Sequence, residues 1–219
     1  MESDLRSCGL LDRCRAIATS TWSDALDSLS LPGVLSGLIH RSGAGRAAGR
    51  AVTVREVTAP LGTYTIQEFA VGQFLAACAP DTILVIALDG AAVSTFGGLA
   101  ARGALNQGVA GVVIDGACRD LADIRQSGLW LASRHVTPTS GKRRAKVQAI
   151  NAQIECAGVT VQPGDIVVAD ETGIVCLPSA RVSEVLTAAE ELTDRDARFE
   201  ALLRQGRSFE EAASALHHL

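Results

Sequence analysis

The chain has 219 residues, of which 47% are hydrophobic and 20% are charged. This is enough apolar material for the core of one generous domain or of two very small ones. The formal net charge of −4 argues against a partner made of nucleic acid or anionic lipid, because no basic stripe is present to neutralise phosphates.

The N-terminal region is predicted to start with helices. Its first nine residues are acidic and polar, a pattern that does not indicate a signal peptide. Apolar positions at helical spacing over 10–29 predict two short helices, with Ser20 or Thr21 as the N-cap between them. Five Gly and Pro residues then predict a loop over 31–45.

The next segment alternates strand and helix signals. Residues 49–57 alternate and are β-branched, which predicts a strand. Thr65 and Glu68 have the spacing of a capping box, which predicts a helix that runs to about Ala79. The apolar run over 82–88 then predicts a strand buried on both faces.

The centre of the chain continues this alternation. An Ala-rich helix is expected over 98–107 and a buried strand over 110–115, with a loop leaving the carboxyl end of that strand. Helices and strands in this order, joined by short links, indicate an α/β fold.

The second half is predicted to be richer in strands and to end in helices. Strands are expected at 129–133, 153–161, 165–170 and 173–178. One long amphipathic helix should cover 181–204, and a capping box at Ser208 and Glu211 should open a last short helix. We expect a single domain over 1–219 with a C-terminal helical extension from about 180, since no internal repeat and no long linker is present.

The cysteines and one basic cluster have structural interpretations. The six cysteines (8, 14, 78, 118, 156 and 176) form no C-x-x-C pair, which favours small buried hydrophobic residues of a reduced cytoplasmic protein. Lys142, Arg143 and Arg144, with Lys146, are interpreted as a solvated loop. No apolar stretch approaches the roughly 20 residues of a membrane span, so no membrane partner is expected.

The loop after the strand at 82–88 is a candidate anion site. Residues 89–99 lead into a helix, and Gly97 and Gly98 leave its first backbone N–H groups unobstructed. Such amides can hold a carboxylate or a phosphate. A glycine turn without a ligand is the alternative. The dinucleotide-binding fingerprint is absent.

The loop after the strand at 110–115 holds the candidate reactive residues. Asp120 could hold a hard divalent cation, and the neighbouring Arg119 could grip a carboxylate or enolate oxygen. Asp123 follows one helical turn later and could bind the waters of the cation. The alternative is an Arg119–Asp120 salt bridge that caps the following helix.

These residues resemble the signature of a known family. Gly98, twenty intervening residues, Arg119-Asp120, two residues and Asp123 are similar to the motif of the 4-hydroxy-4-methyl-2-oxoglutarate aldolase family. Its relatives include 4-carboxy-4-hydroxy-2-oxoadipate aldolases and ribonuclease regulators of the RraA type. The resemblance extends over most of the chain, at 23–26, 49–54, 111–120 and 158–178.

The resemblance implies a fold, an assembly and a reaction. The implied fold is a layered α/β/β domain like the swivelling phosphohistidine domain, assembled as a trimer or hexamer with sites between subunits. The implied cofactor is Mg²⁺ or Mn²⁺ on Asp120, with Arg119 beside the keto oxygen of a pyruvoyl group. The amides of Gly97, Gly98, Leu99 and Ala100 would bind its carboxylate.

One position departs from the family pattern. Aldolase members often carry an acid in place of Gly98, on the leaving-group side, so this chain is expected to decarboxylate oxaloacetate better than it cleaves large dicarboxylate aldols. An acid of the C-terminal helix also reaches a neighbouring site in aldolase members. Asp196 and Glu200 are both candidates for that place.

Three functions are therefore weighed. The favoured one is a divalent-metal-dependent lyase that cleaves a C–C bond beside a pyruvoyl group, acting on pyruvate-related 2-oxo acids such as oxaloacetate or a 4-hydroxy-2-oxo dicarboxylate. A regulatory binding protein of the RraA type, without metal dependence, is the alternative. A methyltransferase is disfavoured, because the glycine pattern expected for a nucleoside cofactor is missing. The apolar stripe at 182, 185, 186, 189 and 192 is predicted to need a partner surface, which favours an assembly of subunits.

Overall fold

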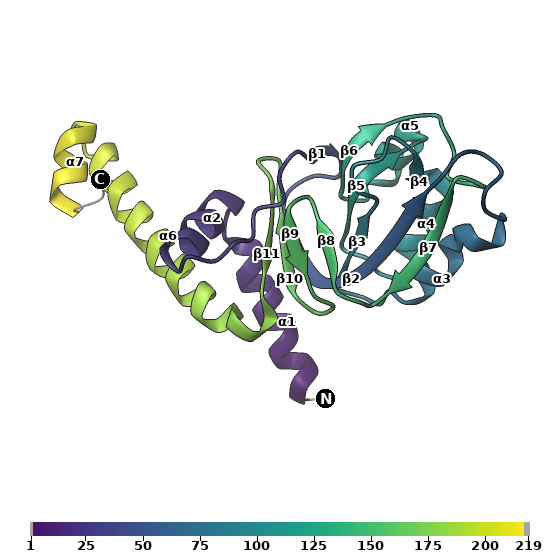
Figure 1. The fold of residues 1–219 in the computed structure, drawn as a ribbon. Helices are drawn as coiled ribbons and strands as arrows, with labels where there is room; N and C mark the ends of the chain where they lie inside the picture. The colour runs from purple at the N-terminus through teal and green to yellow at the C-terminus, as the bar shows by residue number, and fades with distance from the viewer. Residues whose placement is uncertain (1, 217–219) are drawn as a thin grey trace.

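The computed structural model describes residues 2–216, and for residues 2–8 only the backbone. Within this part of the chain, nine strands form one mixed sheet and two further strands form a separate hairpin. Helices pack against the sheet (Figure 1). The prediction of an α/β fold is confirmed, whereas the likeness to the swivelling phosphohistidine domain stays a prediction.

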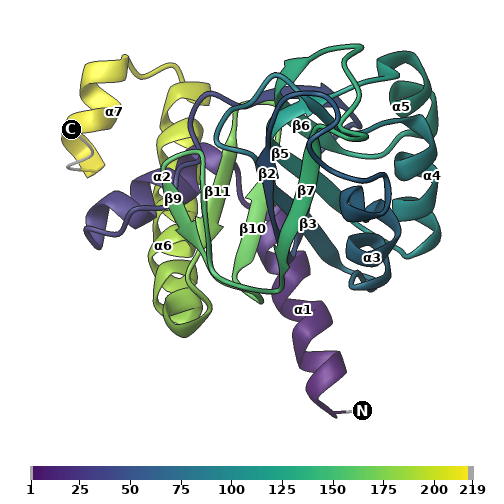
Figure 2. The ribbon, with the colours of Figure 1, turned by 45° about the vertical axis from the view of Figure 1, so that its right-hand side comes forward.

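The centre of the sheet is parallel. Its neighbouring strands are β2 (Ala47–Thr58), β3 (Thr82–Ala87), β5 (Gly111–Cys118) and β6 (Leu131–Val136). Strands β3 and β5 are apolar and almost wholly buried because both of their faces are covered. One face packs against α3 (Val71–Ala76), α4 (Gly98–Asn106) and α5 (Leu121–Ser127), which lie together in Figure 2.

The ends of the sheet are antiparallel. Strand β1 (Ile39–Ser42) pairs with β6, while β10 (Ile166–Ala169) joins β2 to β11 (Ile174–Leu177). The 12-residue β2 pairs with β10 near its start and with β7 (Ala145–Ile150) near its end. The short β4 (Ser94–Phe96) lies parallel to the end of β5. Because β2 has different partners at its two ends, the sheet curls (Figure 2).

Two more layers complete the core. The hairpin of β8 (Ile154–Cys156) and β9 (Val159–Val161) packs on the face of the sheet opposite α3–α5. The outer face of β10 and β11 is covered by α1 (Glu2–Ala16), α2 (Thr19–Ser28) and the start of α6 (Val182–Arg204). The far end of α6 projects from the body and carries α7 (Phe209–Leu216) (Figure 1).

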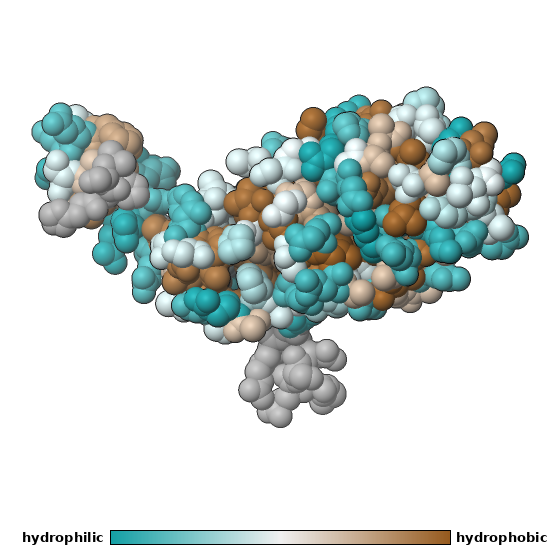
Figure 3. Space-filling model, viewed as in Figure 1, coloured by the Kyte–Doolittle hydropathy of each residue, from teal (hydrophilic) through white to brown (hydrophobic). Residues whose placement is uncertain are grey.

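The apolar stripe of α6 finds its partner inside the chain. Val185, Leu186 and Ala189 are buried against α1, α2 and the β10–β11 strands. The stripe does have the partner surface that was predicted, but this surface belongs to the same chain, so the stripe gives no support to an assembly of subunits. The space-filling view shows hydrophobic patches on the body, while the middle of the projecting α6 is mainly hydrophilic (Figure 3).

The expected helix from Thr65 to Ala79 is broken. Thr65 and Glu68 do form the capping box, with Glu68 N–H donating to Thr65 Oγ1 and Thr65 N–H to the Glu68 carboxylate. The box opens only a 3₁₀ turn, η1 (Gln67–Phe69). Ala70 then adopts a left-handed conformation with φ 43°, so α3 starts afresh at Val71.

Other differences concern short elements with weak signals. The loop predicted at 31–45 contains β1, and the segment interpreted as a solvated basic loop runs directly into β7. The N-cap between the first helices is Ala18, not Ser20 or Thr21. Its helix is capped instead from across the fold, because Thr19 N–H donates to the Asp170 carboxylate at 3.0 Å.

The prediction that the cysteines are small buried residues is confirmed for the five described side chains. Cys14, Cys78, Cys118, Cys156 and Cys176 are free and buried, and burial raises the pKa of the Cys156 thiol to about 12. Cys8 lies outside the described side chains. No helix in the described residues is long and apolar enough to cross a membrane.

Candidate functional site

The corner between β5 and α5 carries Arg119 and Asp120. Arg119 N–H donates to Phe96 O at 2.9 Å, which ties the corner to β4. Asp120 has φ 53° and ψ 44°, a left-handed conformation that costs a residue with a side chain roughly 1–3 kcal/mol. Strain of this kind concentrates at functional sites, and here it turns the Asp120 carboxylate toward the start of α4.

The N-terminus of α4 faces this corner. Gly97 is extended, and the first helical hydrogen bond runs from Ala101 N–H to Gly97 O. The N–H groups of residues 98–100 precede that bond, so they point out of the helix end. Gly98 N–H donates to Asp120 Oδ2 at 3.3 Å, which shows that one of these amides already accommodates a carboxylate oxygen.

Close approach explains why residue 97 is glycine. A Cβ atom at Gly97 would lie 2.6 Å from Asp120 Oδ2 and 3.2 Å from Arg119 Cγ. Any larger residue would push the two side chains away from the helix end. The backbone amides predicted to bind an anion and the predicted pair of Arg119 and Asp120 therefore belong to the same site.

The alternative of a structural salt bridge is only partly supported. Arg119 Nε and Asp120 Oδ2 are 3.6 Å apart, and both side chains remain more than one third exposed. Asp120 makes no side-chain cap hydrogen bond to α5. A long, exposed pair of this type stabilises a fold little, which leaves both groups available to a ligand.

A cavity of about 430 Å³ opens at this corner. One wall is Arg119, Asp120 and the start of α4; the opposite wall is formed by residues around η1 and by the loop before β7. Most of the lining is apolar, including Ile66, Phe69 and Phe96. Lys142 supplies a second cation to the lining.

The opposite wall was missed from the sequence. Its position is fixed by Lys146, whose Nζ is 2.9 Å from Glu68 Oε1 and holds the pKa of that carboxyl at about 2. Gly141 packs so closely that a Cβ there would lie 2.3 Å from Phe69 Cε2. The capping box and the basic cluster were visible signals, but nothing in their spacing showed that they meet.

Asp123 and Gly98 lie beside the cavity and face each other. A Cβ at Gly98 would be 2.7 Å from Asp123 Cβ and 2.9 Å from Asp123 Oδ2. An acid introduced at position 98 would thus meet a carboxylate on α5. The role of Asp123 toward a metal's waters stays a prediction.

The donor set suits a hard divalent cation held partly by substrate. Among the described residues no three His, Cys, Asp or Glu side chains gather as a closed metal cage. Mg²⁺ usually retains waters and takes one or two carboxylates together with substrate oxygens. Asp120 at the cavity mouth, with Asp123 one helical turn away, fits this open arrangement.

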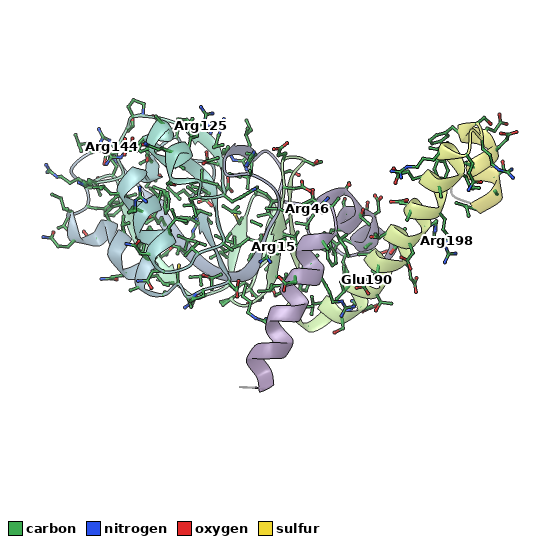
Figure 4. The ribbon with its side chains drawn as sticks, turned by 180° about the vertical axis from the view of Figure 1, so that it is seen from behind. Arg15, Arg46, Arg125, Arg144, Glu190 and Arg198 are labelled. Atoms are coloured by element: carbon green, nitrogen blue, oxygen red, sulfur yellow. The ribbon has the colours of Figure 1, made fainter. Side chains whose placement is uncertain are left out.

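Asp196 and Glu200 are not brought to the cavity within one chain. Both lie on α6, and Glu200 pairs with Arg204 at 2.6 Å. In Figure 4 their neighbour Arg198 lies on the projecting part of α6, at the opposite end of the molecule from Arg144, which follows the cavity loop. Their predicted role requires another subunit and stays a prediction.

Comparison with known proteins places this corner in context. A family model described as RraA-like, Aldolase/RraA, matches residues 19–176. An uncharacterized Methanocaldococcus jannaschii protein is 33% identical over 113 residues, which are 52% of this chain and 54% of that protein. The chain thus matches about half the length of this relative.

Two other similarities cover more of the chain. A Halalkalibacterium halodurans protein, provisionally named a 4-hydroxy-4-methyl-2-oxoglutarate aldolase, is 29% identical over 191 residues, 86% of each chain. The crystal structure of an uncharacterized Pseudomonas syringae protein superposes with a TM-score of 0.84 at 28% identity, covering 93% of this chain and 96% of that one.

Proposed function

The chain belongs to the RraA-like family, whose members include aldolases and RraA proteins, and from this premise we propose that it is a divalent-metal-dependent carbon–carbon lyase acting beside a pyruvoyl group. One observation carries the proposal. Arg119, Asp120 and the free amide end of α4 converge at the mouth of one cavity. A regulator that only binds another protein has no need of this convergence.

Each group of the site is proposed to bind a different part of the substrate. The amides of residues 98–100 bind the carboxylate next to the keto group, in the place where Asp120 Oδ2 now accepts from Gly98 N–H. The Arg119 guanidinium donates to the keto oxygen and stabilises the negative charge that develops there when the C–C bond breaks. Asp120, with Asp123 through water, would hold Mg²⁺ or Mn²⁺, which would supply Lewis-acid stabilisation of the developing negative charge.

The cavity favours a 2-oxo acid with a remote anionic group. Lys142 lines the same cavity as Arg119 and Asp120, together with several apolar side chains. Oxaloacetate and 4-hydroxy-2-oxo dicarboxylates both have a second carboxylate for this cation. Among the described residues Asp120 is the one acid that lines the cavity, so we expect decarboxylation, which needs no base on a leaving hydroxyl, to exceed aldol cleavage.

We also propose that the working assembly is a trimer or a multiple of three. Large hydrophobic side chains around the cavity are exposed, and Leu99, at the start of α4, is 93% exposed. Ile66 on the opposite wall and Val136 near Arg119 are also exposed. Their burial by a second subunit would close the cavity mouth. Light scattering that shows a stable monomer at micromolar concentration would contradict this.

A pyruvate-release assay tests the proposed function. Wild type is assayed with oxaloacetate, 4-hydroxy-4-methyl-2-oxoglutarate and other 2-oxo acids, in Mg²⁺ and in EDTA. We expect Mg²⁺-dependent pyruvate release, fastest with oxaloacetate. No release from any substrate above the metal-only background would overturn the lyase and favour a regulatory binding protein.

A further inference from the structure

A buried acid on β2 has no hydrogen-bond partner among the described residues. Glu56, on β2, is 0% exposed. Neither of its carboxylate oxygens has a hydrogen-bond partner in the described part of the chain, and the same is true of the hydroxyl of Thr95. Buried polar atoms are normally paired, so three unpaired oxygens require an explanation.

The unpaired oxygens belong to one cluster. The Thr95 hydroxyl is close enough to lower the pKa of Glu56, although it lies outside hydrogen-bonding geometry in this structure. Thr95 also lines the cavity, between Ser94 and Phe96. One threonine therefore separates the buried acid from the place where substrate would bind.

The surrounding charges do not neutralise Glu56. On its own strand, Arg55 is bound to Asp89. On β7, Lys146 is bound to Glu68 of the capping box. No described cation contributes to its pKa, so burial raises the pKa of Glu56 to about 7, and the Thr95 hydroxyl opposes this only in part. Near neutral pH the side chain can therefore both give and take a proton.

We propose that Glu56 is the proton store of the site and exchanges its proton with the bound substrate through the Thr95 hydroxyl. The proposal rests on the lyase function proposed above. It supplies the proton-transferring group that Gly98, turned toward Asp123, does not provide.

The step balances for oxaloacetate. The C3–C4 bond breaks, CO₂ leaves, and the electron pair stays on C3 as the enolate of pyruvate. Thr95 gives its hydroxyl proton to C3 and takes the proton of Glu56, which becomes a carboxylate. After pyruvate leaves, Glu56 regains a proton from water, so the net reaction consumes one proton.

The same residue predicts opposite pH dependences for two reactions. Decarboxylation requires protonated Glu56, so its rate falls as pH rises through about 7. Exchange of the pyruvate methyl protons in D₂O begins with proton removal by the Glu56 carboxylate, so its rate rises over the same range. A residue that only supports the fold would not make the two rates change in opposite directions with pH.

Both reactions are measured with the full-length protein in Mg²⁺. We expect Glu56→Gln to lower kcat for both by about 10²-fold, to leave KM near the wild-type value and to abolish both pH limbs. Thr95→Val should resemble Glu56→Gln, and Thr95→Ser should recover most of the loss. Thr53→Val is the matched control, because Thr53 is equally buried on β2 and bonds Ala152 O instead.

The outcomes separate the two proposals. If wild type neither decarboxylates oxaloacetate nor exchanges pyruvate protons, the lyase fails and the proton store fails with it. If wild type does both and Glu56→Gln retains both limbs at near wild-type rates, the function stands and the role of Glu56 is overturned. Circular dichroism shows whether each variant is folded. If Glu56→Gln does not fold, the proton store is tested by Thr95→Val and Thr95→Ser, and equal, wild-type-like rates in these two variants would overturn it.

Discussion

Two aspartates five residues apart, Asp115 within β5 and Asp120 just after it, are used in opposite ways. Asp115 is 6% exposed; Arg134 Nε donates to its Oδ1 at 2.6 Å and Ala157 N–H donates to its Oδ2 at 2.9 Å. Asp120 is exposed and left-handed, and its Oδ2 lies 3.6 Å from Arg119 Nε, beyond hydrogen-bonding distance. Both are acid–arginine pairs, but of the two carboxylates Asp120 is the one whose oxygens remain accessible to a ligand.

The difference lies in what each carboxylate connects. Asp115 joins β5 to β6 and to the turn between β8 and β9, so its hydrogen bonds hold the layers together. Asp120 faces the open end of α4 and a cavity. A short and saturated pair therefore indicates structure, and a loose pair on a left-handed residue indicates a site.

The largest effect is expected from breaking the structural pair. Asp115→Ala leaves Arg134 without its carboxylate partner and should lower the free energy of unfolding by about 3–5 kcal/mol. Urea denaturation at neutral pH measures this change. If the loss is below about 1 kcal/mol, the buried pair does not have the structural role assigned to it.

Arg119→Ala tests the pair that is proposed to act on the substrate. It removes the donor to the developing enolate oxygen, so kcat should fall by about 10²–10³-fold, equivalent to about 3–4 kcal/mol, with stability changed little because the pair is exposed. Steady-state decarboxylation of oxaloacetate in Mg²⁺ measures the effect. A variant with wild-type turnover would place the reaction elsewhere.

A third acid, Glu56, extends the comparison to a carboxyl with no partner. Its pKa is raised from 4.5 to about 7, so its proton contributes stability that is full below pH 4.5 and is lost as pH rises through 7. Relative to Glu56→Gln, wild type should lose roughly 3 kcal/mol of unfolding free energy over this range. Denaturation curves at several pH values check this, and parallel curves would contradict it.

The smallest effect concerns the cation opposite the pair. Lys142→Gln should raise KM for oxaloacetate several-fold, a loss of about 1 kcal/mol, because the distal carboxylate loses its partner. Arg143→Gln removes the same charge from the next residue, which does not line the cavity, and should leave KM unchanged. Equal effects of the two variants on KM would indicate that the positive charge acts through the general electrostatic field and not through a specific contact of Lys142 with the distal carboxylate.

The sequence predicted the elements with strong local patterns. Buried strands such as 82–88 and the long helix at 181–204 carry their own periodicity, so β3 and α6 appeared where expected. The short β1 and β4 owe their form to pairing with distant strands, and a left-handed Ala70 leaves no mark in the sequence. These features are set by tertiary contacts.

The site was predicted from one side only. Arg119, Asp120 and the glycine-rich helix start share a strand end, and the sequence shows that. The opposite wall depends on a turn held by Gly141 and Lys146, far along the chain. Glu56 did leave a signal, since it has the same strand parity as the buried Val52 and Val54, and an acid on the buried face of a strand is rare.

The central claim is that Asp120, and not Asp115, is the carboxylate that holds the metal. Electron paramagnetic resonance of Mn²⁺, titrated with wild type, Asp120→Asn and Asp115→Asn in the presence of pyruvate, tests it most directly. We expect Asp120→Asn to lose Mn²⁺ binding while remaining folded, and the folded fraction of Asp115→Asn to bind Mn²⁺ like wild type. Undiminished Mn²⁺ binding by Asp120→Asn would contradict the claim.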